Sequence, residues 1–176
     1  MKWQQFLISI FDQMSQEMEQ DLKGLTLDDV NIQPSPDTNS IGWLAWHLTR
    51  CFDASTANLI GDEQLWIKAQ WHMKFNRPAD LKDLGINHSP EDLSAFKAPE
   101  VEVILGYYRD VLQLVKQYVA NLSEADLDKE IDHPRFPTVA ARIKGIFNDS
   151  YQHIGQIAYI HGLLKGLGWW ETVRRT

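Results

Sequence analysis

The sequence has few of the residues that mark a disulfide-stabilised, membrane-embedded or nucleic-acid-binding protein. Its single cysteine, Cys51, excludes an internal disulfide framework. The sequence has 17 Lys and Arg residues but 24 Asp and Glu residues, and it has no basic cluster of the kind that binds phosphate groups. No apolar run approaches the roughly 18 residues of a membrane span, and residues 1–20 lack the continuous apolar stretch of a signal peptide. We therefore expect a cytoplasmic protein that binds neither nucleic acid nor membrane.

Helical periodicity dominates the chain. Four segments place apolar residues at steps of three and four, which predicts amphipathic helices. The first begins near Trp3 and is stopped at Gly24, and the second extends from an N-cap at Ser40 to about Gly61. The third covers residues 98–123, and the fourth extends from about residue 138 to residue 164. The predicted buried face of the first helix comprises Trp3, Phe6, Leu7, Ile10, Met14 and Met18.

These elements predict an all-α four-helix bundle that forms a single domain over residues 1–176. The crossover at residues 62–97 is long enough to return the chain along the bundle, which would make the second and third helices parallel. An up-down-down-up order follows. We expect this crossover to pass over one end of the bundle, where the aromatic residues from Trp66 to Phe75 either line a substrate pocket or anchor the loop.

Titratable side chains on two of the apolar faces define a candidate metal site. Asp149 and His153 are four residues apart and therefore lie one turn apart on one face of the fourth helix. His47 shares a face of the second helix with Leu44 and Cys51. One histidine from one helix and an i, i+4 pair from another is a pattern by which bundles hold metals, and three protein ligands leave open positions. The alternatives are histidines hydrogen-bonded to neighbours and a solvated Asp149.

Other residues that could bind a metal or a partner have no assigned role at the site. Cys51 is either a further ligand or a small core residue. His161 is eight residues beyond His153, or ~12 Å along a helix, so the two cannot share one metal. His72, His88 and His133 have no partner at ligand spacing. The pair Trp169 and Trp170 either offers an apolar patch to a partner or caps the bundle.

Two motifs resemble a known family. "NSIGWLAWHLTRCFD" followed far downstream by "DSYQHIGQIAYIHGLLKG" is similar to the DinB and YfiT-like superfamily, four-helix bundles that include bacillithiol- and mycothiol-dependent S-transferases. In that family a histidine of the second helix and two histidines four apart in the fourth helix typically hold the metal. The resemblance places His47 and His153 at two of these positions. Asp149 stands at the third, where the family has histidine, which is also compatible with a member that has lost tight metal binding.

The resemblance implies a divalent-metal site of His47, Asp149 and His153 that accepts zinc, nickel, iron or manganese. The function it predicts is a metal-dependent transferase that activates a low-molecular-weight thiol for attack on a small electrophile. A metal-dependent hydrolase would use the same three ligands. A non-catalytic bundle with an interaction role is the third alternative, and we expect a homodimer. The sequence identifies neither the metal nor the thiol nor the electrophile.

Overall fold

A computed structural model describes residues 1–166, 168 and 169. Four long helices are present: α1 (Trp3–Leu22), α3 (Ile41–Ile60), α7 (Val101–Ala120) and α9 (Val139–Lys165). Five short helices lie between them in the described chain: α2 (Leu27–Asn31), α4 (Leu65–Lys68), α5 (Trp71–Lys74), α6 (Pro90–Ala95) and α8 (Glu124–Leu127). The predicted all-α four-helix bundle is confirmed.

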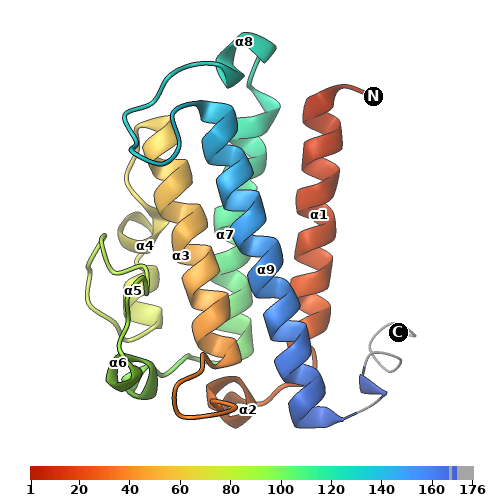
Figure 1. Cartoon of the computed structure of the whole chain (residues 1–176), viewed down its shortest axis with the longest axis vertical. Helices are drawn as coiled ribbons and strands as arrows, with labels where there is room; N and C mark the ends of the chain where they lie inside the picture. The colour runs from red at the N-terminus through yellow and green to blue at the C-terminus, as the bar shows by residue number, and fades with distance from the viewer. Residues whose placement is uncertain (167, 170–176) are drawn as a thin grey trace.

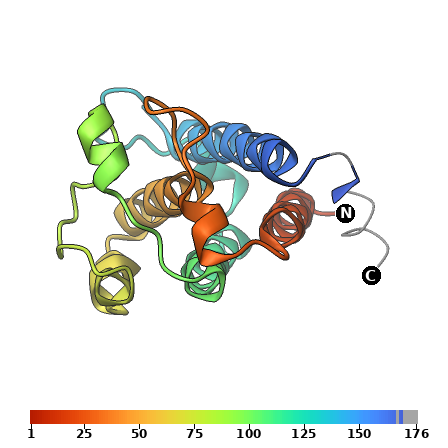
Figure 2. The ribbon, with the colours of Figure 1, turned by 90° about the horizontal axis from the view of Figure 1, so that it is seen from below.

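The long helices follow the predicted up-down-down-up order. α1 and α9 descend in the view of Figure 1, whereas α3 and α7 ascend, so the two helices joined by the long crossover are parallel. Seen along their axes, α3 packs against both α7 and α9, and α1 closes the other side between them (Figure 2). The candidate ligands on α3 and α9 therefore come from neighbouring antiparallel helices.

Local capping explains where the helices at the site begin and end. The Ser40 hydroxyl accepts a hydrogen bond from the Trp43 N–H at 3.2 Å, so it is the predicted N-cap of α3. Gly61 follows the helix with φ of 68°, a left-handed conformation that favours glycine. Thr138 caps α9 by accepting from the Ala141 N–H at 3.2 Å. α7 begins at Val101, later than predicted, because Pro99 lies before the helix rather than in its first turn.

The core differs from the prediction in the rotation of α1. Phe6, expected inside, is 59% exposed, whereas Phe11 is fully buried against Phe52 of α3 and Phe147 of α9. α1 carries apolar residues on more than one face, and the positions of α7 and α9 decide which face is covered. The buried residues of α1 are Phe11, Met14, Met18, Asp21 and Leu22.

The crossover at residues 62–97 covers the outer side of α3 instead of passing over a bundle end (Figures 1 and 2). Trp66, Trp71 and Phe75 are at most 5% exposed and pack around Tyr107 of α7. These aromatic residues therefore anchor the loop, as in the second of the two alternatives. With the crossover on one side and the bundle on the other, α3 is buried over most of its length.

No helix among the described residues combines the length and the apolar character that crossing a bilayer requires.

Candidate metal centre

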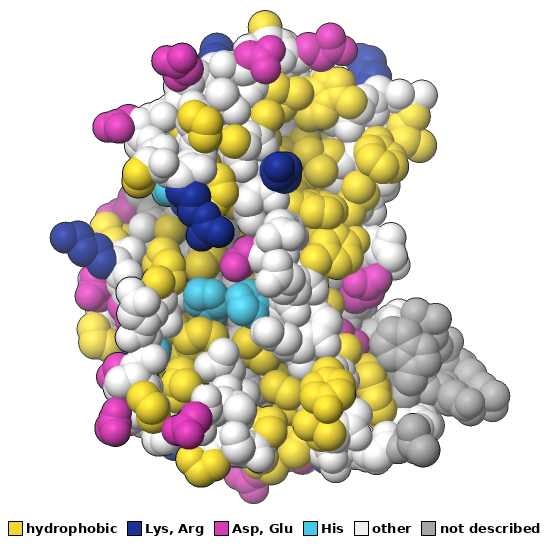
Figure 3. Space-filling model, in the orientation of Figure 1, with side chains coloured by type: hydrophobic (Ala, Val, Ile, Leu, Met, Phe, Trp, Pro, Cys, Tyr) yellow, Lys and Arg dark blue, Asp and Glu magenta, His cyan; other side chains and the backbone are white. Residues whose placement is uncertain are grey.

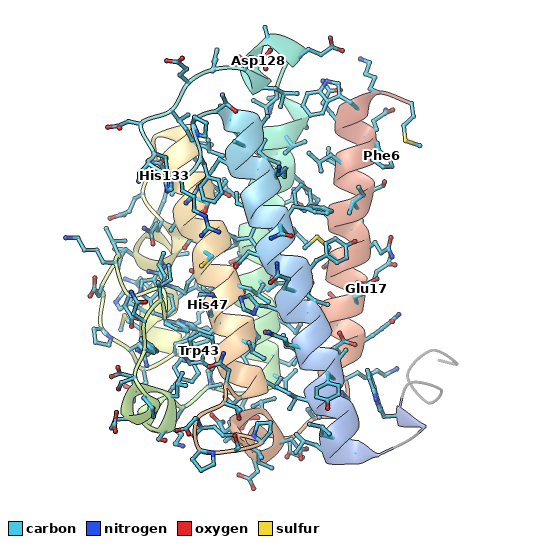
Figure 4. The ribbon with its side chains drawn as sticks, in the orientation of Figure 1. Phe6, Glu17, Trp43, His47, Asp128 and His133 are labelled. Atoms are coloured by element: carbon cyan, nitrogen blue, oxygen red, sulfur yellow. The ribbon has the colours of Figure 1, made fainter. Side chains whose placement is uncertain are left out.

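His47 is held in one orientation by the backbone of the crossover. Its Nδ1 contacts the carbonyl oxygen of Leu84, and because a carbonyl can only accept, Nδ1 carries the proton. Nε2 is then left with a free lone pair. The imidazole also stacks on the Trp43 ring, with centroids 4.8 Å apart and planes 12° apart. Figure 4 shows Trp43 and His47 on the lower half of α3.

Asp149 and His153 lie beside this imidazole on α9. The His153 ring is edge-on to the His47 ring at 4.8 Å between centroids, and its Nε2 lies 3.6 Å from Oδ1 of Asp149. Its Nδ1 contacts Oε1 of Gln156 at 2.8 Å. The Asp149 side chain is 42% exposed, yet its Oδ2 is covered and has no hydrogen-bond partner. The structure thus brings the three predicted residues together at one place.

Cys51 belongs to the same cluster, which the sequence left open. Its Sγ lies 3.9 Å from Nε2 of His47, and one ligand atom each of His47, Cys51 and Asp149 lie within 4.8 Å of one another. Burial, and then the charge of Asp149, raise the pKa of the Cys51 thiol to about 12. The side chain therefore stays protonated near pH 7 in the absence of a cation. His47, Cys51 and Asp149 form the tightest set, and His153 contacts two of its members.

The charges of the cluster oppose one another. Burial lowers the pKa of His47, and the Leu84 carbonyl acts in the other direction without reversing the shift. Burial alone would also lower the pKa of His153, but its contacts with Asp149 and Gln156 raise it above the ordinary value. For Asp149, burial is outweighed by the hydrogen bond and charge of His153, so its pKa is lowered. Asp149 is thus an anion facing one neutral and one readily protonated imidazole.

The arrangement fits a divalent cation. Oδ2 of Asp149 has no hydrogen-bond partner, and Nε2 of neutral His47 has only the weak thiol donor of Cys51 at 3.9 Å. Nε2 of neutral His153 faces the Asp149 carboxylate, which has no proton to donate. The other nitrogen of each imidazole contacts an oxygen, which is how metal-binding histidines are usually oriented. Figure 3 shows two histidine side chains and an acidic one reaching the surface together on the α3–α9 face. Acceptor atoms on three neighbouring side chains, with one side of the cluster open to solvent, suit a site with an exchangeable position.

A chain of hydrogen bonds from the crossover holds the Trp43 ring that stacks on His47. Trp43 donates its indole N–H to Nδ1 of His88 at 3.1 Å, so Nε2 of His88 donates to Oδ1 of Asp83 at 3.0 Å. Asp83 also accepts from Arg77 at 2.7 Å. His88, for which the sequence showed no partner, therefore fixes the ring that stacks on His47.

Arg50 attaches the same loop to α3. Its guanidinium is fully buried and donates to the carbonyl oxygens of Asp83 at 3.2 Å and Asp80 at 3.1 Å. It also lies 3.7 Å from the buried carboxylate of Asp53. Because Leu84 directly follows the segment held by Arg50, this arginine positions the carbonyl that orients His47. No sequence pattern pointed to this role, since the partners are backbone atoms.

The remaining histidines lie elsewhere. His161 contacts the carbonyl oxygen of Asp21 at 2.6 Å and stacks on Trp169 at 4.1 Å between centroids, which agrees with its expected separation from the candidate site. Trp169 thus packs on α9, and Trp170 lies outside the described residues. His72 contacts the carbonyl oxygen of Trp66 at 2.9 Å within the crossover.

A four-helix bundle with a His and carboxylate cluster between two antiparallel helices defines a class of candidate metalloproteins, and comparison with known proteins names the family. The sequence matches the DinB superfamily over residues 10–157, and the chain belongs to that superfamily. It is also similar to a conserved protein from Enterococcus faecalis of known crystal structure. The identity is 28% and the TM-score 0.85, over 94% of this chain and 99% of that one. The comparison with curated proteins gave no match.

Proposed function

We propose that the protein is a divalent-metal-dependent transferase in which His47, Asp149 and His153 hold the metal and a low-molecular-weight thiol attacks a small electrophile. A bound cation would favour the thiolate over the thiol near pH 7, which is the nucleophilic form. Membership of the DinB superfamily and the cluster of possible ligands support this proposal. The observation that carries it is the contact of the His153 ring with His47 and with the Asp149 carboxylate, whose Oδ2 has no hydrogen-bond partner.

The residues around the cluster favour an external nucleophile over a protein one. Cys51 is the sole cysteine of the chain, and its largely buried thiol has a pKa of about 12. A thiol in that state is a poor nucleophile. The partly exposed Asp149 and His153 border the surface, so a small molecule reaches the cluster from the α9 side. In this scheme the chain supplies ligands and orientation, and the bound thiol supplies the attacking sulfur.

Turnover tests the proposal directly. Metal-loaded protein is offered a panel of cellular thiols with a chlorodinitrobenzene as electrophile, with and without a chelator. We expect turnover that the chelator abolishes and that His153→Ala loses. Gln152→Ala is the matched control, because Gln152 is the exposed neighbour of His153 on α9. Turnover unchanged by chelator or equal in both variants would refute the assignment, as would no turnover with any thiol.

A further inference from the structure

Arg142 is held in a fixed position near the N-terminal end of α9. Its guanidinium carbon lies 4.9 Å from the centre of the Phe136 ring, and Nη1 lies 3.2 Å from Nε2 of His133. The Phe136 ring itself packs against the helix at Gly145, where a Cβ would meet its Cε1 at 2.4 Å. Stacking on an aromatic ring restricts a guanidinium without satisfying its five N–H donors. Arg142 is therefore oriented in advance, with donors to spare.

This arginine has no acidic partner. No carboxylate of the described residues lies within ion-pair distance of Arg142, although the half-buried Lys116 and the exposed Lys129 each have one. Its Nε is covered and makes no hydrogen bond. Burial holds the pKa of the guanidinium below its usual value, while the group remains charged. A half-buried cation that lacks an anion is costly to maintain, and a ligand that supplies one relieves that cost.

The neighbourhood of Arg142 is positive on the side of the metal cluster. The Arg135 guanidinium carbon lies 5.5 Å from the centre of the same Phe136 ring. The charges of Arg142 and Arg135 lower the pKa of His133, and the charge of Asp132 acts to raise it. Figure 3 shows basic side chains above the histidines and the acidic side chain on the α3–α9 face, and Figure 4 places His133 above His47 on that face.

Helix geometry sets the distance between this group and the candidate metal. Arg142 and Asp149 are seven residues apart, which is two turns, so they lie on one face of α9 about 10 Å apart along the axis. Both also act on Cys51 of α3: Asp149 raises the pKa of the thiol, and Arg142 lowers it in part. One surface strip thus leads from the metal cluster to Arg142. A molecule with sulfur at one end and an anion several bonds away spans it.

We propose that Arg142, with Arg135 beside it, forms an anion subsite that binds a carboxylate or phosphate group of the molecule whose sulfur occupies the metal centre. The proposal rests on the proposed function for the role of the sulfur. It deepens that function by naming the substrate class, an anionic thiol rather than a neutral one. The competing explanation is that Arg142 only holds the loop of His133 and Phe136 against α9.

A matched pair of thiols separates these explanations. Binding of 6-mercaptohexanoate and of 6-mercaptohexanol to metal-loaded protein is measured by calorimetry, for the parent, Arg142→Gln and Arg135→Gln. A charge-assisted hydrogen bond contributes about 1.5–3 kcal/mol, so we expect the parent to prefer the carboxylate by roughly tenfold or more. Arg142→Gln removes most of that preference and leaves mercaptohexanol affinity unchanged. Lys144→Gln, an exposed cation two residues away, serves as the control and retains the preference.

The outcomes distinguish failure of this proposal from failure of the proposed function. If both thiols bind the parent equally, or if Arg142→Gln keeps the preference, the anion subsite is refuted while thiol binding stands. If neither thiol binds, the thiol function is wrong, and inorganic phosphate then tests the subsite alone. Phosphate binding that Arg142→Gln abolishes supports it, and phosphate binding that is absent or unchanged overturns it. Should Arg142→Gln fail to fold, the exposed Arg135→Gln tests the subsite through the same preference, which must then fall.

Discussion

Gly85 offers the sharpest perturbation of the candidate metal centre that leaves every proposed ligand in place. It directly follows Leu84, whose carbonyl orients His47, and its φ is 79°. A Cβ at this position would lie 2.7 Å from Cζ2 of Trp43 and 3.3 Å from Nδ1 of His47. Gly85→Ala therefore forces the loop away from the imidazole. We expect Leu84 to lose its contact with Nδ1, which frees His47 to rotate.

Gly24→Ala provides the matched control for this change. Gly24 has φ of 78°, but a Cβ there meets no atom within 4 Å. Both substitutions carry the left-handed backbone penalty of about 1–2 kcal/mol, and only Gly85→Ala adds overpacking, which costs about 1–3 kcal/mol. Comparison of the two variants by urea unfolding isolates the steric part. We expect an excess destabilisation of about 1–3 kcal/mol for Gly85→Ala.

Metal affinity is the second measurement on the same pair. Removing an outer partner of a metal-binding histidine typically lowers affinity 10–100-fold. We therefore expect a loss of that size in Gly85→Ala and none in Gly24→Ala, measured by competition with a chelating indicator dye. Equal affinity in the two variants, despite the excess destabilisation, would show that the Leu84 carbonyl does not orient a ligand. Equal stability as well would refute the packing argument itself.

Three further predictions concern buried charges. Burial raises the pKa of Asp21 to about 7, so the free energy of unfolding falls as the pH rises from about 4 to 7. In urea unfolding, Asp21→Asn should therefore recover up to about 4 kcal/mol at pH 8 but little at pH 4. Because the pKa of His153 is raised, a proton should compete with the metal at higher pH than for an ordinary histidine; metal affinity that stays flat from pH 8 to 5 would contradict this. Arg50→Met leaves Asp53 buried without its cation and should lower the free energy of unfolding by about 3–5 kcal/mol. The exposed control Arg109→Met should lower it by about 1 kcal/mol or less. Similar losses in the two variants would refute the role of Arg50.

The sequence predicted those features that depend on local chemistry. The N-cap at Ser40 and the glycine at Gly61 were found from residue type alone, because a cap needs only its own side chain and the next turn. The i, i+4 relation of Asp149 and His153 follows from helix geometry in the same way. The parallel arrangement of α3 and α7 was predicted from the length of the crossover, and the up-down-down-up order followed from it.

Features that depend on distant contacts were missed. The rotation of α1 is fixed by its neighbours, so Phe6 faces solvent although it matches the apolar period. The Leu84 carbonyl that orients His47 is a backbone atom, and no sequence pattern marks it. His88 finds its partner Trp43 at a separation of 45 residues. The sequence left Cys51 as either a further ligand or a small core residue. Only the packing of α3 on α9 showed that its sulfur lies close to Asp149.

Metal stoichiometry tests the central claim most directly. Protein purified without chelators, or loaded with zinc and then desalted, is analysed by elemental mass spectrometry alongside His47→Ala, Asp149→Ala and His153→Ala. We predict about one metal ion per chain in the parent and in the control Gln152→Ala, and far less in the three ligand variants. Cys51→Ser should retain the metal if three ligands suffice. A parent without metal after loading, or ligand variants that keep it in full, would contradict the account.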